Sequence, residues 1–79
     1  MSAGPFSGQG LQRGSFARNL RAARLEAGLS QERLSALAGL HRTEISLLER
    51  GARDPKLSTI LRLADALGVS AAALVAAED

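Results

Sequence analysis

A chain of 79 residues is the length of one domain, and the absence of cysteine excludes disulfides, thiolate metal sites and a thiol nucleophile. Alanine and leucine, both strong helix formers, dominate a composition without tryptophan or tyrosine, which predicts an all-α fold. The net charge of +2 is uneven: residues 1–42 hold six basic and two acidic side chains, whereas residues 43–79 hold four basic and six acidic ones. This asymmetry suits an acidic partner such as a phosphate backbone.

Residues 1–13 are predicted to be a disordered N-terminal tail, because they are rich in glycine and show no hydrophobic periodicity. This segment lacks the basic stretch followed by an apolar run that is typical of a secretory signal. No apolar run approaches the roughly 20 residues that a membrane span needs. We therefore expect a cytoplasmic protein that does not contact a membrane.

Residues 14–79 are predicted to form the folded domain, with glycines and serines marking the helix ends. Glycines that can take the left-handed conformation follow four amphipathic segments, at Gly28, Gly39, Gly51 and Gly68. Serines that can cap a helix N-terminus precede four helical runs, at Ser15, Ser30, Ser58 and Ser70. Together they predict five short helices, over residues 15–27, 31–38, 42–50, 58–67 and 71–77.

The apolar residues of these segments recur at helical spacing and predict one small all-α core. The expected core residues are Phe16, Leu20, Ala23, Ala27, Leu34, Leu37, Ala38, Leu40, Ile45, Leu48, Leu57, Ile60, Leu63, Ala64, Leu67, Val69 and Leu74. No segment shows the alternation that is typical of a β-strand.

The stretch from Gln31 to Leu48 is the most informative for function. Two helices of about eight residues joined by a short turn at Gly39 must cross steeply, which requires a small residue such as Ser35 where they approach. This is the spacing of a helix-turn-helix. A helix of this kind fits the major groove of DNA, where each base pair displays a distinct pattern of donors and acceptors.

Four side chains of the third segment share its outer face once the core positions are assigned, namely Arg42, Thr43, Ser46 and Leu47. We interpret them as base-reading residues. Arg42 can donate to O6 and N7 of a guanine, Thr43 and Leu47 can contact a thymine methyl group, and Ser46 can bond a base edge or a phosphate. Glu44 is interpreted as a favourable charge near a helix N-terminus, with reading of a cytosine as the alternative.

Phosphate contacts are predicted around this face. Gln31, at the start of the second segment, can hold a phosphate together with the helix-end amides. Three cations lie at or just after the end of the third segment, where the chain would run along the DNA backbone: Arg50, Arg53 and Lys56. His41 is predicted to be a solvent-facing helix cap that can also contact phosphate. With one histidine and no cysteine, we expect no metal ion and no other cofactor.

The sequence resembles the Cro and phage-repressor type of helix-turn-helix domain, also called the xenobiotic-response-element family, over residues 16–77. The matching motifs are Leu29-Ser30-Gln31, Gly39, Ile45-Ser46, Leu48-Glu49-Arg50-Gly51, Pro55 and Leu67-Gly68-Val69-Ser70. The stretch His41-Arg42-Thr43 is similar to the controller proteins of restriction–modification systems in particular. The resemblance implies a five-helix, lambda-repressor-like DNA-binding domain.

The resemblance also implies roles for single residues. An arginine and a glutamate that pair in the family match Arg24 and Glu49, and the family's phosphate-binding glutamine matches Gln31. Members of the family commonly bind DNA as symmetric dimers, and the two subunits often pair through their C-terminal helices. Apolar side chains that suit such an interface here are Leu61, Leu74 and Val75.

We therefore expect a sequence-specific transcriptional regulator, acting as repressor or activator, that binds palindromic double-stranded DNA as a homodimer. The chain offers no obvious set of catalytic residues or small-molecule pocket, so it is not expected to be an enzyme. The alternative is a protein-binding module of the same fold, an antitoxin or a co-activator bridge, in which the same apolar residues contact a second protein. A third possibility is a fragment of a longer regulator with an effector domain after Asp79.

Overall fold

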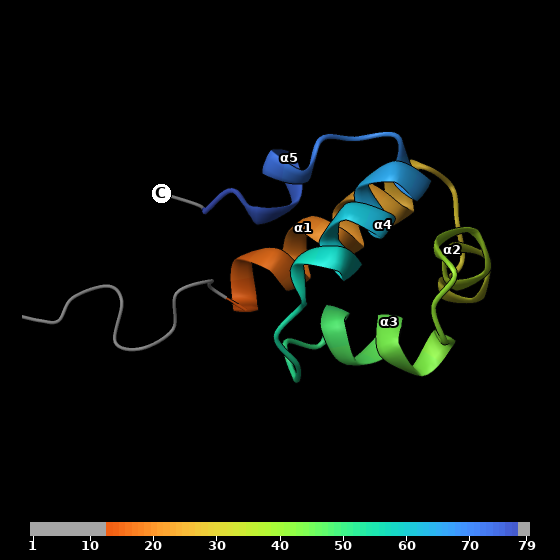
Figure 1. The fold of residues 1–79 in the computed structure, drawn as a ribbon, viewed down its shortest axis with the longest axis horizontal. Coiled ribbons are helices and arrows are strands. Elements are labelled where there is room, and N and C mark those ends of the chain that lie inside the picture. The colour runs from red at the N-terminus through yellow and green to blue at the C-terminus, as the bar shows by residue number, and fades with distance from the viewer. Residues whose placement is uncertain (1–12, 78–79) are drawn as a thin grey trace, which may run out of the picture.

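The computed structural model describes residues 13–77, which form five helices: α1 (Arg13–Glu26), α2 (Gln31–Ala38), α3 (Arg42–Glu49), α4 (Leu57–Leu67) and α5 (Ala71–Val75) (Figure 1). The predicted all-α fold is confirmed, and each helix begins and ends within two residues of its predicted bounds. The disordered tail predicted over residues 1–13 lies outside the described residues except for Arg13, which begins α1. None of the described helices is long and apolar enough to cross a membrane.

The helix ends follow the predicted glycines and two of the predicted serines. Gly39 and Gly68 take the left-handed conformation, with φ of 73° and 72°, directly after α2 and α4. The hydroxyl oxygens of Ser30 and Ser70 accept hydrogen bonds from the backbone N–H groups three residues later, at 2.9 and 3.0 Å.

The other two predicted serine caps are wrong. Ser15 lies inside α1 and is buried, because that helix begins two residues earlier. Lys56 is the N-cap of α4, because Leu57 already takes helical geometry, so Ser58 lies in the first turn of the helix.

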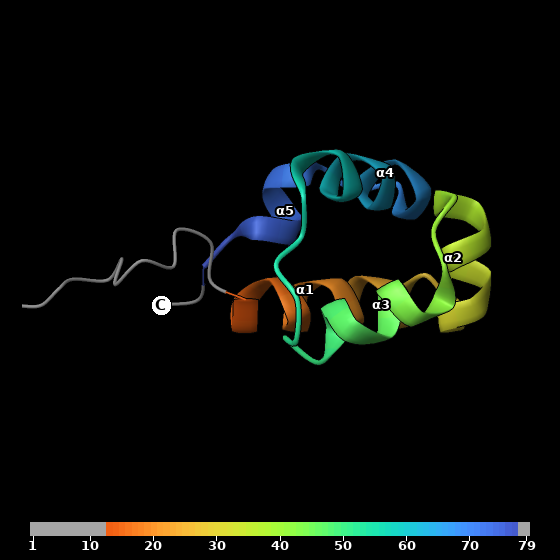
Figure 2. The same ribbon diagram turned by 60° about the horizontal axis from the view of Figure 1, so that its bottom comes forward.

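The helices pack in two layers closed at one end by α2 (Figure 2). In that view α1 and α3 lie on one side and α4 and α5 on the other, and α2 contacts both α3 and α4. α1 contacts α3 and α5, so the first helix holds both of these helices to the same core. α3 consequently lies along one edge of the molecule with one side inward and one side outward (Figure 1).

Ten apolar side chains form the core: Phe16, Leu20, Leu34, Ala38, Ile45, Leu48, Ile60, Leu63, Ala64 and Leu74. Four residues that were predicted to be in the core are exposed, among them Leu37 at 50% and Leu57 at 70%. Leu37 lies beside the buried stripe of α2, and Leu57 begins α4 at its solvent-facing end. Ala27 and Val69 are exposed because both lie beyond the last turn of a helix.

Asn19 ties the short α5 to α1. Its side-chain Nδ2 donates to the backbone oxygens of Leu74 and Ala76, each at 2.9 Å. These carbonyl groups are the ones that a helix end leaves without intrahelical partners. Ala76 then takes an extended conformation, so α5 ends at Val75, two residues earlier than predicted.

Candidate nucleic-acid interface

α2 and α3 are joined by a turn of three residues. Gly39 has φ of 73° and ψ of 34°, and the Leu40 N–H donates to the Ser35 carbonyl oxygen at 2.9 Å, which closes the end of α2. His41 is extended and forms the N-cap of α3 without a side-chain capping bond. Ser35 is 7% exposed, so a small side chain occupies the position where a larger one would separate the helices. This turn makes α2 and α3 a helix-turn-helix unit.

One side of α3 faces the core and the other faces solvent. Ile45 and Leu48 have no exposed surface. Because each helical residue turns by about 100°, Thr43 and Leu47 lie on the opposite side of the helix. Arg42 and Thr43 are exposed, and Ser46 and Leu47 are partly exposed. All four predicted base-reading side chains therefore lie outside the core.

Three helices meet at the carboxylate of Glu49, the last residue of α3. Arg24 of α1 donates from Nε to Oε2 at 2.6 Å and from Nη2 to Oε1 at 2.9 Å. Its Nη1 donates to the Leu29 carbonyl oxygen at 2.9 Å. The ion pair that the family resemblance implied is thus present, and only 9% and 3% of the two side chains are exposed. The hydrogen bonds from Arg24 to the carboxylate raise the pKa of the guanidinium.

Gln31 joins this cluster from the first position of α2. Its Nε2 donates to Oε1 of Glu49 at 3.1 Å, so the same oxygen accepts from both Gln31 and Arg24. A side-chain amide has two N–H donors, so one remains for a phosphate. The amide is consequently fixed beside the N–H groups at the start of α2, where an anion is favoured.

The predicted phosphate-binding cations are all exposed, but they differ in their contacts. Arg50 follows α3 directly and donates weakly from Nε to the Ser46 carbonyl oxygen at 3.4 Å. Lys56 is the N-cap of α4 and makes no side-chain capping bond. Arg53 pairs with Glu44 of α3, a contact between residues nine positions apart that no pattern in the sequence predicts.

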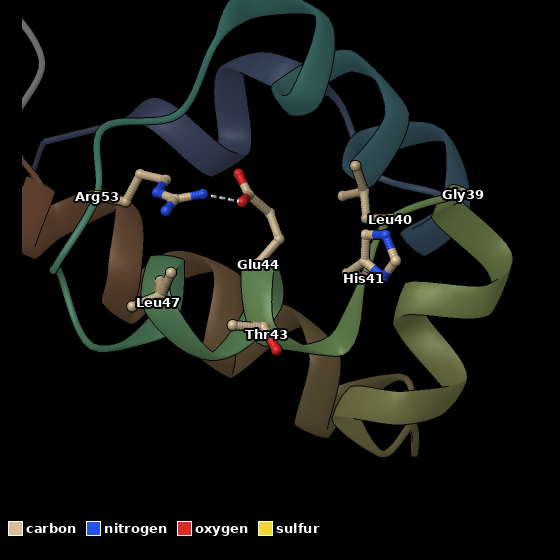
Figure 3. Close-up of a pocket in the computed structure, with 7 residues that line it drawn as sticks. All are labelled: Gly39, Leu40, His41, Thr43, Glu44, Leu47 and Arg53. Atoms are coloured by element: carbon tan, nitrogen blue, oxygen red, sulfur yellow. Dashed lines mark hydrogen bonds and ion pairs between the residues drawn. The ribbon is translucent and has the colours of Figure 1, made fainter.

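This ion pair borders an open pocket of about 340 Å³. The turn residues Gly39, Leu40 and His41 form one wall, and Thr43, Glu44 and Leu47 of α3 form another, with Arg53 opposite (Figure 3). Two of the predicted base readers, Thr43 and Leu47, therefore share a hollow with the Glu44–Arg53 pair. The sequence gives no direct sign of the pocket, because Arg53 reaches it from a segment without regular structure.

Comparison with known proteins identifies the class to which this arrangement belongs. A family model described as helix-turn-helix matches residues 20–74, which is more than half of the chain. The chain belongs to this helix-turn-helix family.

Relatives of the helix-turn-helix chain include regulators and controller proteins. It is 44% identical over 61 residues to an uncharacterised HTH-type transcriptional regulator of Sinorhizobium fredii, covering 77% of this chain and 79% of the relative. It is 47% identical over 55 residues to control protein C.SmaI of Serratia marcescens, covering 70% and 66%. The crystal structure of the restriction-modification controller protein C.AhdI from Aeromonas hydrophila superposes with a TM-score of 0.77 and 42% identity, covering 78% of this chain and 94% of that chain. The resemblance to restriction–modification controllers is confirmed.

The comparisons support DNA-binding transcription regulation as the class of function for this helix-turn-helix chain. They name transcriptional regulators and controller proteins rather than enzymes. In residues 13–77, no three histidine, aspartate or glutamate side chains lie together as a metal ion would require.

One of the three residues predicted for a dimer interface is in the wrong place for that role. Leu74 is 1% exposed, because α5 turns this side chain into the core between α1 and α4. A buried side chain cannot contact a second subunit of the helix-turn-helix protein. Leu61 is 52% exposed and Val75 is partly buried, so both retain surface for such a contact.

Proposed function

We propose that this protein is a sequence-specific DNA-binding transcriptional regulator that places α3 in the major groove of DNA. The observation that carries the proposal is the outward face of α3, on which Arg42 and Thr43 are exposed while Ile45 and Leu48 fill the core. A helix fits the major groove, and polar side chains on such a face reach base edges. The helix-turn-helix family and the controller relatives support the same class of function.

The base-reading roles follow from the chemistry of each side chain. Arg42 donates to O6 and N7 of a guanine, Thr43 and Leu47 contact a thymine methyl group, and Ser46 bonds a base edge or a phosphate. Leu47 is partly exposed beside the pocket, which is the surface that contact with a methyl group requires.

Phosphate contacts fix the register of the protein on DNA without carrying sequence information. We assign them to the Gln31 amide at the N-terminus of α2 and to four exposed side chains around α3: His41, Arg50, Arg53 and Lys56. The Glu49 carboxylate holds the Gln31 amide in place, so this contact needs little reordering on binding.

The protein acts as a homodimer on a palindromic operator in this proposal, because a two-fold symmetric dimer reads two inverted half-sites. The half-sites then lie about 10–10.5 base pairs apart, which is one turn of DNA. Leu61 and Val75 provide apolar surface for the dimer contact. Leu57 lies one helical turn before Leu61 and is 70% exposed, so the two leucines form a continuous apolar side of α4.

Selection of bound sequences from random duplex DNA tests the proposal. The expected result is an inverted repeat with one preferred guanine per half-site, together with a dimer by sedimentation at micromolar concentration. A pool without any enriched sequence would overturn sequence-specific binding. A direct repeat or single site with a monomeric protein would overturn the symmetric model but leave DNA binding intact.

The alternative function is a protein-binding module of the same fold, and the exposed Leu57 and Leu61 are the observation that favours it. These side chains would then contact a second protein instead of a second copy. Stoichiometric co-purification with a different small protein, lost when Leu61 is replaced by serine, supports the alternative. A purified chain that is dimeric by itself, and becomes monomeric in Leu61→Ser, contradicts it.

A further inference from the structure

The Glu44–Arg53 pair lies beside the proposed base-reading face rather than against the core. Glu44 follows Thr43 directly and precedes Leu47 by three residues, so it borders the same side of α3. All three side chains line the pocket at this end of α3, and Arg53 reaches the Glu44 carboxylate across it (Figure 3). Glu44 lies on the opposite edge of the outer face from Arg42, because the two positions differ by about 200° around the helix.

The pair contributes little to stability. The Arg53 side chain is 51% exposed and that of Glu44 is 22% exposed, and ion pairs that water reaches are screened by water and salt. The position of the ion pair beside the base-reading face therefore matters for DNA binding rather than for stability. A lone carboxylate that entered a groove lined by phosphates would be repelled, and the guanidinium of Arg53 neutralises that charge.

Hydrogen-bonding capacity remains on both partners. Arg53 Nη1 donates to Oε1 of Glu44, while Oε2 of Glu44 accepts no hydrogen bond from residues 13–77. A carboxylate oxygen only accepts, and a guanidinium has five N–H donors. Glu44 can therefore accept from a base while the other N–H groups of Arg53 donate to a phosphate.

We propose that Glu44, held by Arg53, is a specificity-determining residue that accepts a hydrogen bond from the amino group of a cytosine in each half-site. This inference rests on the proposed function. In the major groove the cytosine amino group lies between a C–H group and one acceptor, whereas the adenine amino group lies between two acceptors. A carboxylate therefore prefers cytosine, because its second oxygen is repelled by one neighbouring acceptor there and by two acceptors beside adenine.

Selection from random duplex DNA with four proteins tests the inference: the wild type, Glu44→Gln, Arg53→Ala and the control Glu32→Gln. Glu32 is an exposed acidic residue in the first turn of α2, so its replacement removes the same charge away from the pocket. The wild type and the control should enrich the same operator, with a cytosine at one position of each half-site that Arg42 does not read.

Glu44→Gln should lose that cytosine preference by about 5- to 150-fold, because glutamine suits adenine, while the other positions stay unchanged. Arg53→Ala should bind every sequence more weakly and show a reduced preference at the same position only. Glu44→Ala keeps the test decisive if the glutamine variant does not fold, because alanine is the strongest helix former and offers no acceptor.

The outcomes separate this inference from the function on which it rests. If the wild type enriches no sequence, the proposed function fails and this inference fails with it. If the wild type enriches an operator but Glu44→Gln enriches the same one, with affinity raised on all DNA as in Glu32→Gln, Glu44 is only a charge and the inference alone is overturned. An unchanged cytosine preference in Arg53→Ala would refute the claim that Glu44 needs Arg53 to read the cytosine.

Discussion

Replacing Glu49 by alanine should lower the free energy of unfolding by about 3–5 kcal/mol, the range seen when one partner of a buried ion pair is removed. Arg24 is 7% exposed and gives two of its three hydrogen bonds to this carboxylate. Without it, the guanidinium stays in the protein with the Leu29 carbonyl oxygen as its remaining acceptor. The Gln31 amide loses its acceptor as well.

The expected loss is a large part of the total. Domains have free energies of unfolding of roughly 0.05–0.15 kcal/mol per residue, which is about 4–12 kcal/mol for a chain of this length. At about 4–8 °C per kcal/mol for a small domain, the melting temperature should fall by roughly 12–40 °C. Urea and thermal unfolding followed by circular dichroism, at one fixed protein concentration, measure both quantities.

Two further variants distinguish the loss of the charge partner of Arg24 from other causes of the lower stability. Glu32→Ala removes an exposed carboxylate from the first turn of α2 and should cost no more than about 1 kcal/mol. The double variant Arg24→Met with Glu49→Leu should recover wild-type stability or exceed it, because no unpaired charge is then buried. A loss below about 1 kcal/mol in Glu49→Ala would refute the reasoning, since it would mean that water solvates the guanidinium in the folded protein.

The direction of the Arg24 pKa shift fixes the pH range of this stabilisation. A pKa raised in the folded state stabilises the protein at every pH below the pKa of the unfolded chain, and the gain is lost only as the pH rises through the raised value. The ordinary pKa of arginine already lies far above neutrality. We therefore expect no loss of stability from Arg24 between about pH 6 and pH 9.

Three further predictions concern DNA binding and assembly. Arg42→Ala should lose about 1–3 kcal/mol of discrimination at one guanine, measured by competition between operators, and an equal loss on scrambled DNA would contradict base reading. Lys56→Ala should reduce the steepness of the slope of log affinity against log salt concentration by about 0.9, and an unchanged slope would exclude a phosphate contact. Leu61→Ser should shift sedimentation toward monomer, whereas Leu25→Ser, which replaces a leucine of similar exposure (54% against 52%), should not. A dimer that survives Leu61→Ser would place the interface elsewhere.

The sequence was sufficient to predict where the helices lie, because helix ends depend on local chemistry. Gly39 and Gly68 each permit the left-handed conformation that ends a helix, and Ser30 and Ser70 each satisfy a backbone N–H group near by. The core was predicted less well at the ends of helices. Periodicity identifies one apolar side of a helix but not where the neighbouring helices stop covering it, so the exposure of Leu57 was missed.

Contacts between distant side chains could be predicted only where a family supplied them. The Arg24–Glu49 pair was inferred from resemblance and is present. The bonds from Asn19 to the end of α5 and from Arg53 to Glu44 join residues whose approach depends on how the whole chain packs. Polar residues at such positions look like ordinary surface residues in the sequence, because no local periodicity distinguishes them.

Two glutamates of α3 have separate consequences for the interface. Glu49 joins α1 and the start of α2 to the end of α3, so its loss changes how the recognition helix sits on the core and how the Gln31 amide is presented. Such a change affects binding to every DNA sequence, because orientation and phosphate contacts are common to all of them. Glu44 lies at the solvent-facing pocket, and in the described part of the chain its carboxylate forms a hydrogen bond and an ion pair with Arg53 alone. Under the proposed role, loss of Glu44 should change the preference at one base while α3 keeps its place. Comparing the two variants on matched and scrambled operators would then separate the residues that support the interface from those that read the sequence.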